Sequence, residues 1–212
     1  MLSLCDRSGV AVAPWVAAGF QAVIVDVQHE GDTTDGAVRR IGRDVRLLEL
    51  DDLGGPFVFG FGFPPCTHFA GSGARWWAGK GDVPLIESLS IADACLRILR
   101  ATCDSWAIEN PVGRLTRFWG SFDHSFNPCD FGGYKGGEGD AYTKRTCLWT
   151  GGGYQHPAPK PIEPTEGSRM HLVPPGPERQ NIRSETPRGW AQATFEANAR
   201  LDLFGRADLR HA

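Results

Sequence analysis

The 212-residue sequence contains six cysteines, but no two of them stand at CxxC spacing. Zinc ribbons need such pairs, and the spread of these cysteines does not suggest a secreted disulfide framework. No apolar run reaches the length of a membrane span, and the first residues lack the basic and apolar regions of a secretory signal. We therefore expect a cytoplasmic protein with free thiols and no metal site, and the sequence gives no sign of a membrane or protein partner.

An excess of positive charge is also missing, because the formal net charge is −3. This charge argues against a broad nonspecific surface for nucleic acid. Basic side chains outnumber acidic ones only in residues 135–212, so any nucleic-acid contact is expected mainly there, with local exceptions at Arg75, Arg114 and Arg117. The hydrophobic content of 41% suits one compact domain with a sizeable core.

Strand and helix patterns alternate through the first half of the chain. We expect strands at residues 2–5, 22–27, 44–48, 57–61 and 106–108, and helices at residues 10–18 and 83–102. This alternation favours an α/β fold, a single domain built on a doubly wound, mostly parallel sheet. The glycine-rich residues 69–82 are expected to form a mobile loop.

The second half of the chain is less regular. Residues 120–182 are rich in glycine, proline and aromatic residues and contain one clear strand, at 146–150. A last helix is expected to begin at Thr186-Pro187, a capping residue followed by a proline, and to run to about residue 204. We therefore divide the single domain of residues 1–212 into a core at 1–119, a Gly/Pro-rich region at 120–182 and a closing helix at 183–205.

Polar residues follow several of the expected strands. In an open α/β sheet, the crevice beyond the carboxyl ends of the strands binds ligands. The residues expected to gather at this edge are Asp6, Asp26, Asp44, Cys66 and Glu109.

Cys66 is the candidate nucleophile of this edge. A cysteine is more often a small buried hydrophobic residue, but Cys66 follows two prolines that take the chain out of the sheet and precedes the polar Thr67 and His68. A thiolate is a strong nucleophile, and nearby positive charge or a helix amino-terminus lowers a thiol pKa. Carbon 6 of a pyrimidine would be a suitable electrophile.

Glu109 is the candidate acid. The tripeptide Glu109-Asn110-Pro111 by itself is typical of a turn, but apolar residues precede it. Burial raises a carboxyl pKa, which suits a group that donates a hydrogen bond to a ring nitrogen.

Taken together, these motifs resemble the C5-cytosine DNA methyltransferase family, in particular its compact phage forms. The matching segments, in chain order, are LSLCDRSGVAVAPWVAAGF, Asp26, Asp44, FPPCTHFAGSG, ENPVG, TKRTCLW and RSETPRGWAQATFEAN. The resemblance covers nearly the whole chain. The Pro-Cys loop followed by Glu-Asn, in this order and spacing, is its most specific part.

The resemblance implies a Rossmann-like fold that binds S-adenosylmethionine (SAM) and acts on a cytosine flipped out of DNA. Cys66 would attack carbon 6, Glu109 would steady ring nitrogen 3 and the exocyclic amine, Asn110 would brace the Cys66 loop, and Arg145, with Lys144, would lie near the catalytic loop or a phosphate. Asp26 would hold the SAM ribose and Asp44 the adenine amine. The full set of implied cofactor-binding residues is Cys5, Asp6, Ser8, Gly9, Asp26, Val27, Asp44, Val45 and Pro64.

The chain departs from the family pattern in two places. The first turn keeps only Gly9 where the family has more glycine, and Cys5 and Asp6-Arg7-Ser8 replace part of that pattern. Between Trp149 and Arg183 there are only about thirty residues, where full-length relatives carry a target-recognition domain. Readout of the DNA sequence is therefore expected to be short or relaxed.

Other interpretations remain open. The enzyme could modify a free pyrimidine nucleotide, or the chain could be a non-catalytic nucleic-acid-binding or decoy protein with a SAM-binding fold. Trp76 and Trp77 could clamp a base or anchor their loop. A zinc site is the weakest alternative, and its candidate ligands are His124, Cys129, Cys147 and His156. A further basic cluster is expected to be a solvated helix face, and it consists of Arg39, Arg40, Arg43 and Arg46.

Overall fold

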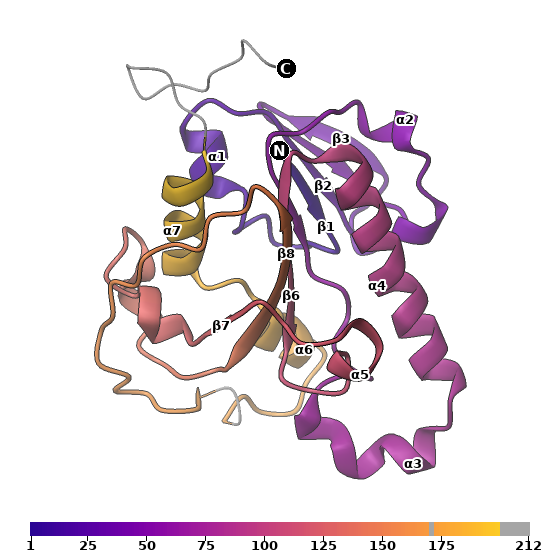
Figure 1. Ribbon diagram of the computed structural model, residues 1–212, viewed down its shortest axis with the longest axis vertical. Coiled ribbons are helices and arrows are strands. Elements are labelled where there is room, and N and C mark those ends of the chain that lie inside the picture. The colour runs from indigo at the N-terminus through magenta and orange to yellow at the C-terminus, as the bar shows by residue number, and fades with distance from the viewer. Residues whose placement is uncertain (170–171, 200–212) are drawn as a thin grey trace.

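A central sheet of eight strands organises the protein in a computed structural model that describes residues 1–169 and 172–199 (Figure 1). Its strands are β1 (Leu2–Leu4), β2 (Ala22–Val25), β3 (Asp32–Asp35), β4 (Val38–Ile41), β5 (Gly60–Gly62), β6 (Ser105–Pro111), β7 (His124–Phe126) and β8 (Thr146–Gly152). The strand order is β3-β4-β2-β1-β5-β6-β8-β7. The pairs from β4 to β6 are parallel, whereas β3 and β8 run against their neighbours. The predicted mostly parallel, doubly wound sheet is confirmed.

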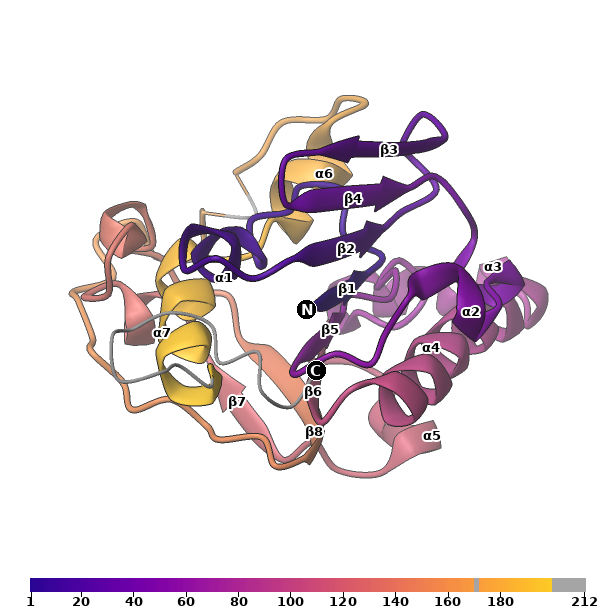
Figure 2. The same cartoon turned by 90° about the horizontal axis from the view of Figure 1, so that it is seen from above.

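Helices cover both faces of this sheet. They are α1 (Ala13–Ala17), α2 (Leu50–Leu53), α3 (Trp77–Lys80), α4 (Val83–Thr102), α5 (Thr116–Trp119), α6 (Arg179–Ser184) and α7 (Arg188–Asn198). Short 3-10 helices are η1 (Val45–Leu47), η2 (Gly71–Trp76), η3 (Pro128–Phe131) and η4 (Gly137–Gly139). Figure 2 shows α1 and α7 on one face and α4 on the other. Because both faces are covered, every residue of the central strands β1 and β5 is buried, rather than every second one.

Two hydrophobic clusters fill the layers on either side of the sheet. On the α1 and α7 face, Trp15 stacks on Phe59, and Trp190 lies against Phe61 and Phe126. On the α4 face, Leu99 packs with other fully or nearly fully buried apolar residues, which include Leu2, Leu4, Ile98 and Ile108. The expected helix at 83–102 is confirmed: its second half packs in this layer, and Leu85, Leu89 and Ala92 pack in a third, smaller cluster with Phe69 and Trp149.

The third strand was predicted at the wrong place. Residues 44–48 contain η1, whose first turn is capped by the Asp44 side chain, and the strand that pairs with β2 is β4. The sequence of β4, Val-Arg-Arg-Ile, has two central arginines that hide its strand pattern. Arg39 and Arg40 therefore lie on a strand, and the expectation of a basic helix face is wrong for them.

The secondary structure also differs from the expectation in three other segments, where the backbone is more helical, more regular or more interrupted than the sequence indicated. The expected loop at 69–82 contains η2 and α3, and residues 120–181 also contain β7, η3 and η4. Residues 183–205 are not one helix, because α6 ends before Thr186-Pro187 and α7 begins at Arg188. The expected end of the last helix near residue 204 lies outside the described residues.

Candidate active site

The carboxyl ends of the parallel strands open into a cavity of about 1390 Å³. Figure 1 shows α3, α5 and α6 gathered at this lower end of the molecule. The cavity brings together eleven of the thirteen residues singled out in the sequence as catalytic or cofactor-binding: Cys5, Asp6, Ser8, Asp26, Val27, Asp44, Val45, Pro64, Cys66, Glu109 and Arg145. Gly9 and Asn110 do not line it, but each is hydrogen-bonded to a residue that does.

Asp6 organises the turn after β1. Its carboxylate accepts hydrogen bonds from the Ser3 hydroxyl at 2.8 Å, the Ser8 hydroxyl at 3.2 Å and the Gly9 N–H at 2.8 Å. Gly9 has a φ of +69°, and a Cβ there would meet Ile24 Cδ1 at 2.9 Å. One glycine is therefore sufficient for this turn, because hydrogen bonds to the Asp6 carboxylate fix the rest of its conformation.

Cys5 precedes this turn in a left-handed conformation with a φ of 55°. Its Sγ lies 3.7 Å from Cys95 Sγ on α4, so the thiol packs against the helix behind the cavity. Contact with Cys95 and burial raise the pKa of Cys5.

Asp26 directly follows β2, at the start of a turn. The Asp26 side chain is 9% exposed, and one carboxylate oxygen accepts the Gln28 N–H at 2.8 Å. Among the described residues its other oxygen has no hydrogen-bond donor. Asp26 thus keeps acceptor capacity toward the cavity.

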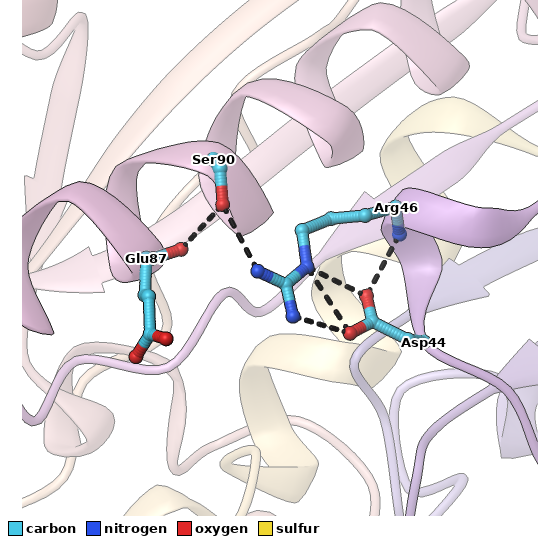
Figure 3. A network of polar contacts seen from close by, with 4 residues as sticks. All are labelled: Asp44, Arg46, Glu87 and Ser90. Atoms are coloured by element: carbon cyan, nitrogen blue, oxygen red, sulfur yellow. Dashed lines mark hydrogen bonds and ion pairs between the residues drawn. The ribbon is translucent and has the colours of Figure 1, made fainter.

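Asp44 belongs to a network that ties η1 to α4 (Figure 3). Its carboxylate accepts from Arg46 Nη2 at 2.6 Å and from Arg46 Nε at 3.0 Å, and Arg46 Nη1 reaches the Ser90 hydroxyl at 3.3 Å. The Arg46 hydrogen bonds hold the pKa of Asp44 below its ordinary value. Asp44 is therefore a fixed, ionised acceptor at the cavity wall, beside the buried Val45.

The Cys66 loop is braced by the end of β6 and by the chain that follows it. Asn110 Nδ2 donates to the Pro64 carbonyl at 2.9 Å, the Gly71 N–H donates to the Val112 carbonyl, and the Arg114 N–H donates to the Phe69 carbonyl. Phe69 is fully buried beneath the loop. These bonds fix the path of the loop on either side of Cys66.

Glu109 does not sit after the strand, as the sequence suggested, but within β6. Ile108 pairs with Gly62, the last residue of β5, and β6 continues through Pro111 because β8 pairs with it on the other side. Glu109 therefore lies where β5 has just left the sheet toward Cys66. Its Oε1 is buried and has no hydrogen-bond partner among the described residues.

Burial dominates the electrostatics of this pair. Burial raises the pKa of Glu109, as expected, and Lys144 opposes the shift. Burial and the nearby Glu109 charge also raise the pKa of Cys66, although Lys144 and Arg183 act in the opposite direction. Nearby cations can lower a thiol pKa, but here burial and Glu109 outweigh them.

Lys144 and Arg145 precede β8 and both line the cavity. Lys144 is the cation that acts on both Glu109 and Cys66, whereas Arg145 is exposed and lies over the Phe122 ring at 5.8 Å. The sequence resemblance places Arg145 in the catalytic set with Lys144 beside it, and these roles remain predictions. Sequence reasoning also missed Arg179 and Arg183, whose only signal was the basic character of residues 135–212.

The metal alternative gains nothing from this arrangement. Within residues 1–169 and 172–199, no three His, Cys, Asp or Glu side chains are grouped so that they could hold a metal ion. His124 and His156 instead stack face to face at 4.2 Å.

The same part of the chain contains no helix with the length and apolar character needed to cross a membrane.

The two tryptophans of the 69–82 segment have different surroundings. Trp77 is half-buried under the Arg114 guanidinium, 4.4 Å from its ring, whereas Trp76 is 58% exposed and lines the cavity. Trp77 is therefore the anchor of this segment, and Trp76 stands at the cavity mouth.

No protein-family model matches the chain, and no curated protein matches it in sequence. Its fold is similar to the crystal structure of an E. coli prophage-encoded protein provisionally assigned as a DNA modification methyltransferase, with a TM-score of 0.53 and 15% identity. The match covers 76% of this chain and 52% of that one, so the chain spans about half the length of that structure. The fold is the Rossmann-like fold of methyltransferases, as predicted.

Proposed function

We propose that the protein is a SAM-dependent methyltransferase that methylates carbon 5 of cytosine in DNA, with Cys66 as the covalent nucleophile. The observation that carries this proposal is one cavity shared by Cys66, the unpartnered buried oxygen of Glu109, and the acceptors Asp26 and Asp44. A methyl donor and a pyrimidine need such adjoining sites, because the transfer is direct.

The residues of the Asp26 side of the cavity fit the cofactor. By this we mean the loops that carry Asp6, Asp26 and Asp44, together with Val27 and Val45. Asp26 has a free carboxylate oxygen for a ribose hydroxyl, and Asp44 would accept from the adenine amine. The turn of Asp6 to Gly9 would lie along the methionine part. When bound, SAM supplies an electrophilic methyl group.

The Cys66 side of the cavity, formed by Cys66, Glu109, Lys144, Arg145 and the chain near them, fits the base. The Cys66 thiol loses its proton and its sulfur bonds to carbon 6, while a protonated Glu109 donates a hydrogen bond to ring nitrogen 3 and draws electron density away from the ring. Carbon 5 would then accept the methyl group that bound SAM supplies, with S-adenosylhomocysteine as the leaving group. Loss of the carbon 5 proton to a base restores the ring double bond and releases Cys66.

A polyanionic substrate is supported by the unpaired cations that line the cavity. Five cationic side chains that line the cavity form no salt bridge within the described part of the chain: Arg75, Lys144, Arg145, Arg179 and Arg183. Arg7 and Arg43, nearer Asp6 and Asp44, are both paired with carboxylates. Unpaired cations beside the reactive thiol favour a substrate with several phosphates over a single nucleotide.

The direct test is the product. Purified protein is incubated with SAM and a cytosine-containing duplex, and the nucleosides are separated by liquid chromatography and identified by mass spectrometry. We expect 5-methyl-deoxycytidine from the wild type and from Cys103→Ser, whose thiol lies outside the cavity, and none from Cys66→Ser. Methylation of free deoxycytidine monophosphate but not of the duplex would contradict the DNA substrate, and product from Cys66→Ser would contradict the mechanism.

A further inference from the structure

Between β8 and α7, the chain crosses the cavity mouth as a short segment, residues 176–186, which we call the α6 segment. It is fastened to the Asp26 side at two points. Arg7 Nη1 donates to Glu178 Oε2 at 2.7 Å, and the side-chain amides of Gln28 and Asn181 are hydrogen-bonded at 3.3 Å. Both contacts fall on loops that follow parallel strands, so the segment has a defined position above the site.

Two arginines of the α6 segment remain without carboxylate partners. Arg179 and Arg183 are four residues apart, which places them on the same face of the helix, and both are half-buried at the cavity. Arg179 Nε is buried and has no hydrogen-bond partner within the described chain. The carboxylates beside them are engaged elsewhere, because Glu178 pairs with Arg7 and Glu185 lies 3.7 Å from Arg188.

Arg183 and Cys66 line the same cavity, and the Arg183 charge offsets part of the rise in the pKa of the Cys66 thiol. A group bound to Arg183 would therefore lie near the reacting base but would not occupy the base site itself. Guanidinium groups bind phosphate oxygens with paired N–H donors, and phosphate contacts fix the position of a strand without reading its sequence.

We propose that Arg179 and Arg183 bind phosphates of the substrate strand beside the target nucleotide, so that the α6 segment holds DNA by its backbone. This inference rests on the proposed function and names the means by which the substrate is held. It explains how the roughly thirty residues between Trp149 and Arg183 can serve a polymer substrate without a separate recognition domain. DNA held in this way should bind with the same affinity whatever its base sequence.

The test measures binding of fluorescein-labelled 20-base-pair duplexes of four unrelated sequences by fluorescence anisotropy, across a salt titration. The proteins are the wild type, Arg179→Gln, Arg183→Gln, Arg183→Lys and the control Arg97→Gln, an exposed α4 residue away from the cavity. Each Gln variant should weaken binding roughly 5- to 10-fold on all four duplexes and reduce the slope of log K against log salt by about 0.9. Arg183→Lys should restore most of that slope, and Arg97→Gln should match the wild type.

Thermal unfolding and calorimetric SAM binding accompany each variant, and both should be unchanged because these arginines do not hold the fold or the cofactor. An unchanged salt slope, or a loss confined to one duplex sequence, would overturn the inference while leaving wild-type methylation of DNA intact. A wild type that makes no methylated cytosine would instead overturn the proposed function, so the two failures are distinguishable.

Discussion

The two sides of the cavity differ in how completely their polar groups are satisfied. On the Asp26 side, Asp6 and Asp44 are held by hydrogen bonds within the protein, and Arg7 and Arg43 form ion pairs. On the Cys66 side, Glu109 Oε1 has no partner among the described residues, and Lys144, Arg145 and the nearby Arg183 have no described carboxylate within salt-bridge distance. The first side is preorganised by the chain itself, whereas the second leaves groups for which a substrate would supply the partners.

The largest expected effect comes from removing the charge of Glu109. Glu109→Gln should reduce methyl transfer about 100- to 1000-fold, since an amide N–H is a weaker donor than a carboxylic acid and draws less electron density from the ring when Cys66 attacks. The same change should make Cys66 react faster with iodoacetamide at pH 8, because the Glu109 charge raises the pKa of the thiol and its removal lowers that pKa. Slower alkylation in the variant would contradict the coupling between the two groups.

The pH dependence of wild-type alkylation has a definite sign. Because burial and Glu109 raise the pKa of Cys66, its alkylation rate should level off at a higher pH than that of a free thiol such as N-acetylcysteine. Mass spectrometry of the Cys66 peptide separates this rate from that of other cysteines. A rate that levels off below pH 8 would show that the cations outweigh burial and Glu109.

A smaller effect is expected on the Asp26 side. Asp26→Ala should weaken SAM binding by about 1 to 3 kcal/mol, the range for hydrogen bonds to a charged group. Isothermal calorimetry measures this loss, and Asp35→Ala on the exposed strand β3 is the matched control. Equal SAM affinities for the two variants would show that Asp26 does not bind the cofactor.

The smallest effect concerns the turn that Asp6 organises. Gly9→Ala should lower the free energy of unfolding by about 1 to 2 kcal/mol, because its φ of +69° is strained for alanine and the new Cβ would crowd Ile24. Urea unfolding followed by tryptophan fluorescence measures the change. Gly153→Ala is the control, because a Cβ there would meet no atom within 4 Å. Equal stability of the two variants would show that the turn adapts.

The sequence was most informative where a residue type or spacing permits only one local structure. The prolines before Cys66 and the regular apolar spacing of residues 83–102 led to the correct loop and helix. The α/β architecture followed from alternating patterns, and the comparison of structures confirmed it. The roles of Cys66, Glu109 and the other site residues remain predictions.

Tertiary pairing decided the rest. The two arginines Arg39 and Arg40 give β4 a polar sequence, and it is a strand because it pairs with β2. Pairing with β8 likewise keeps Glu109 to Pro111 within the sheet, although Pro111 lacks a backbone N–H. Arg179 and Arg183 reach the site only because Glu178 and Asn181 fasten the α6 segment to loops more than 150 residues earlier in the chain. No local pattern carries that information.

The most direct test of the account uses a duplex that contains 5-fluorocytosine, incubated with the protein and SAM. Carbon 5 of this base has no removable proton, so release of Cys66 is blocked and the protein should be trapped as a covalent adduct. Peptide mapping by mass spectrometry should place the adduct on Cys66, and Cys66→Ser should form none. An adduct on Cys5, Cys129 or Cys147, or no adduct from a protein that methylates unmodified DNA, would contradict the central claim.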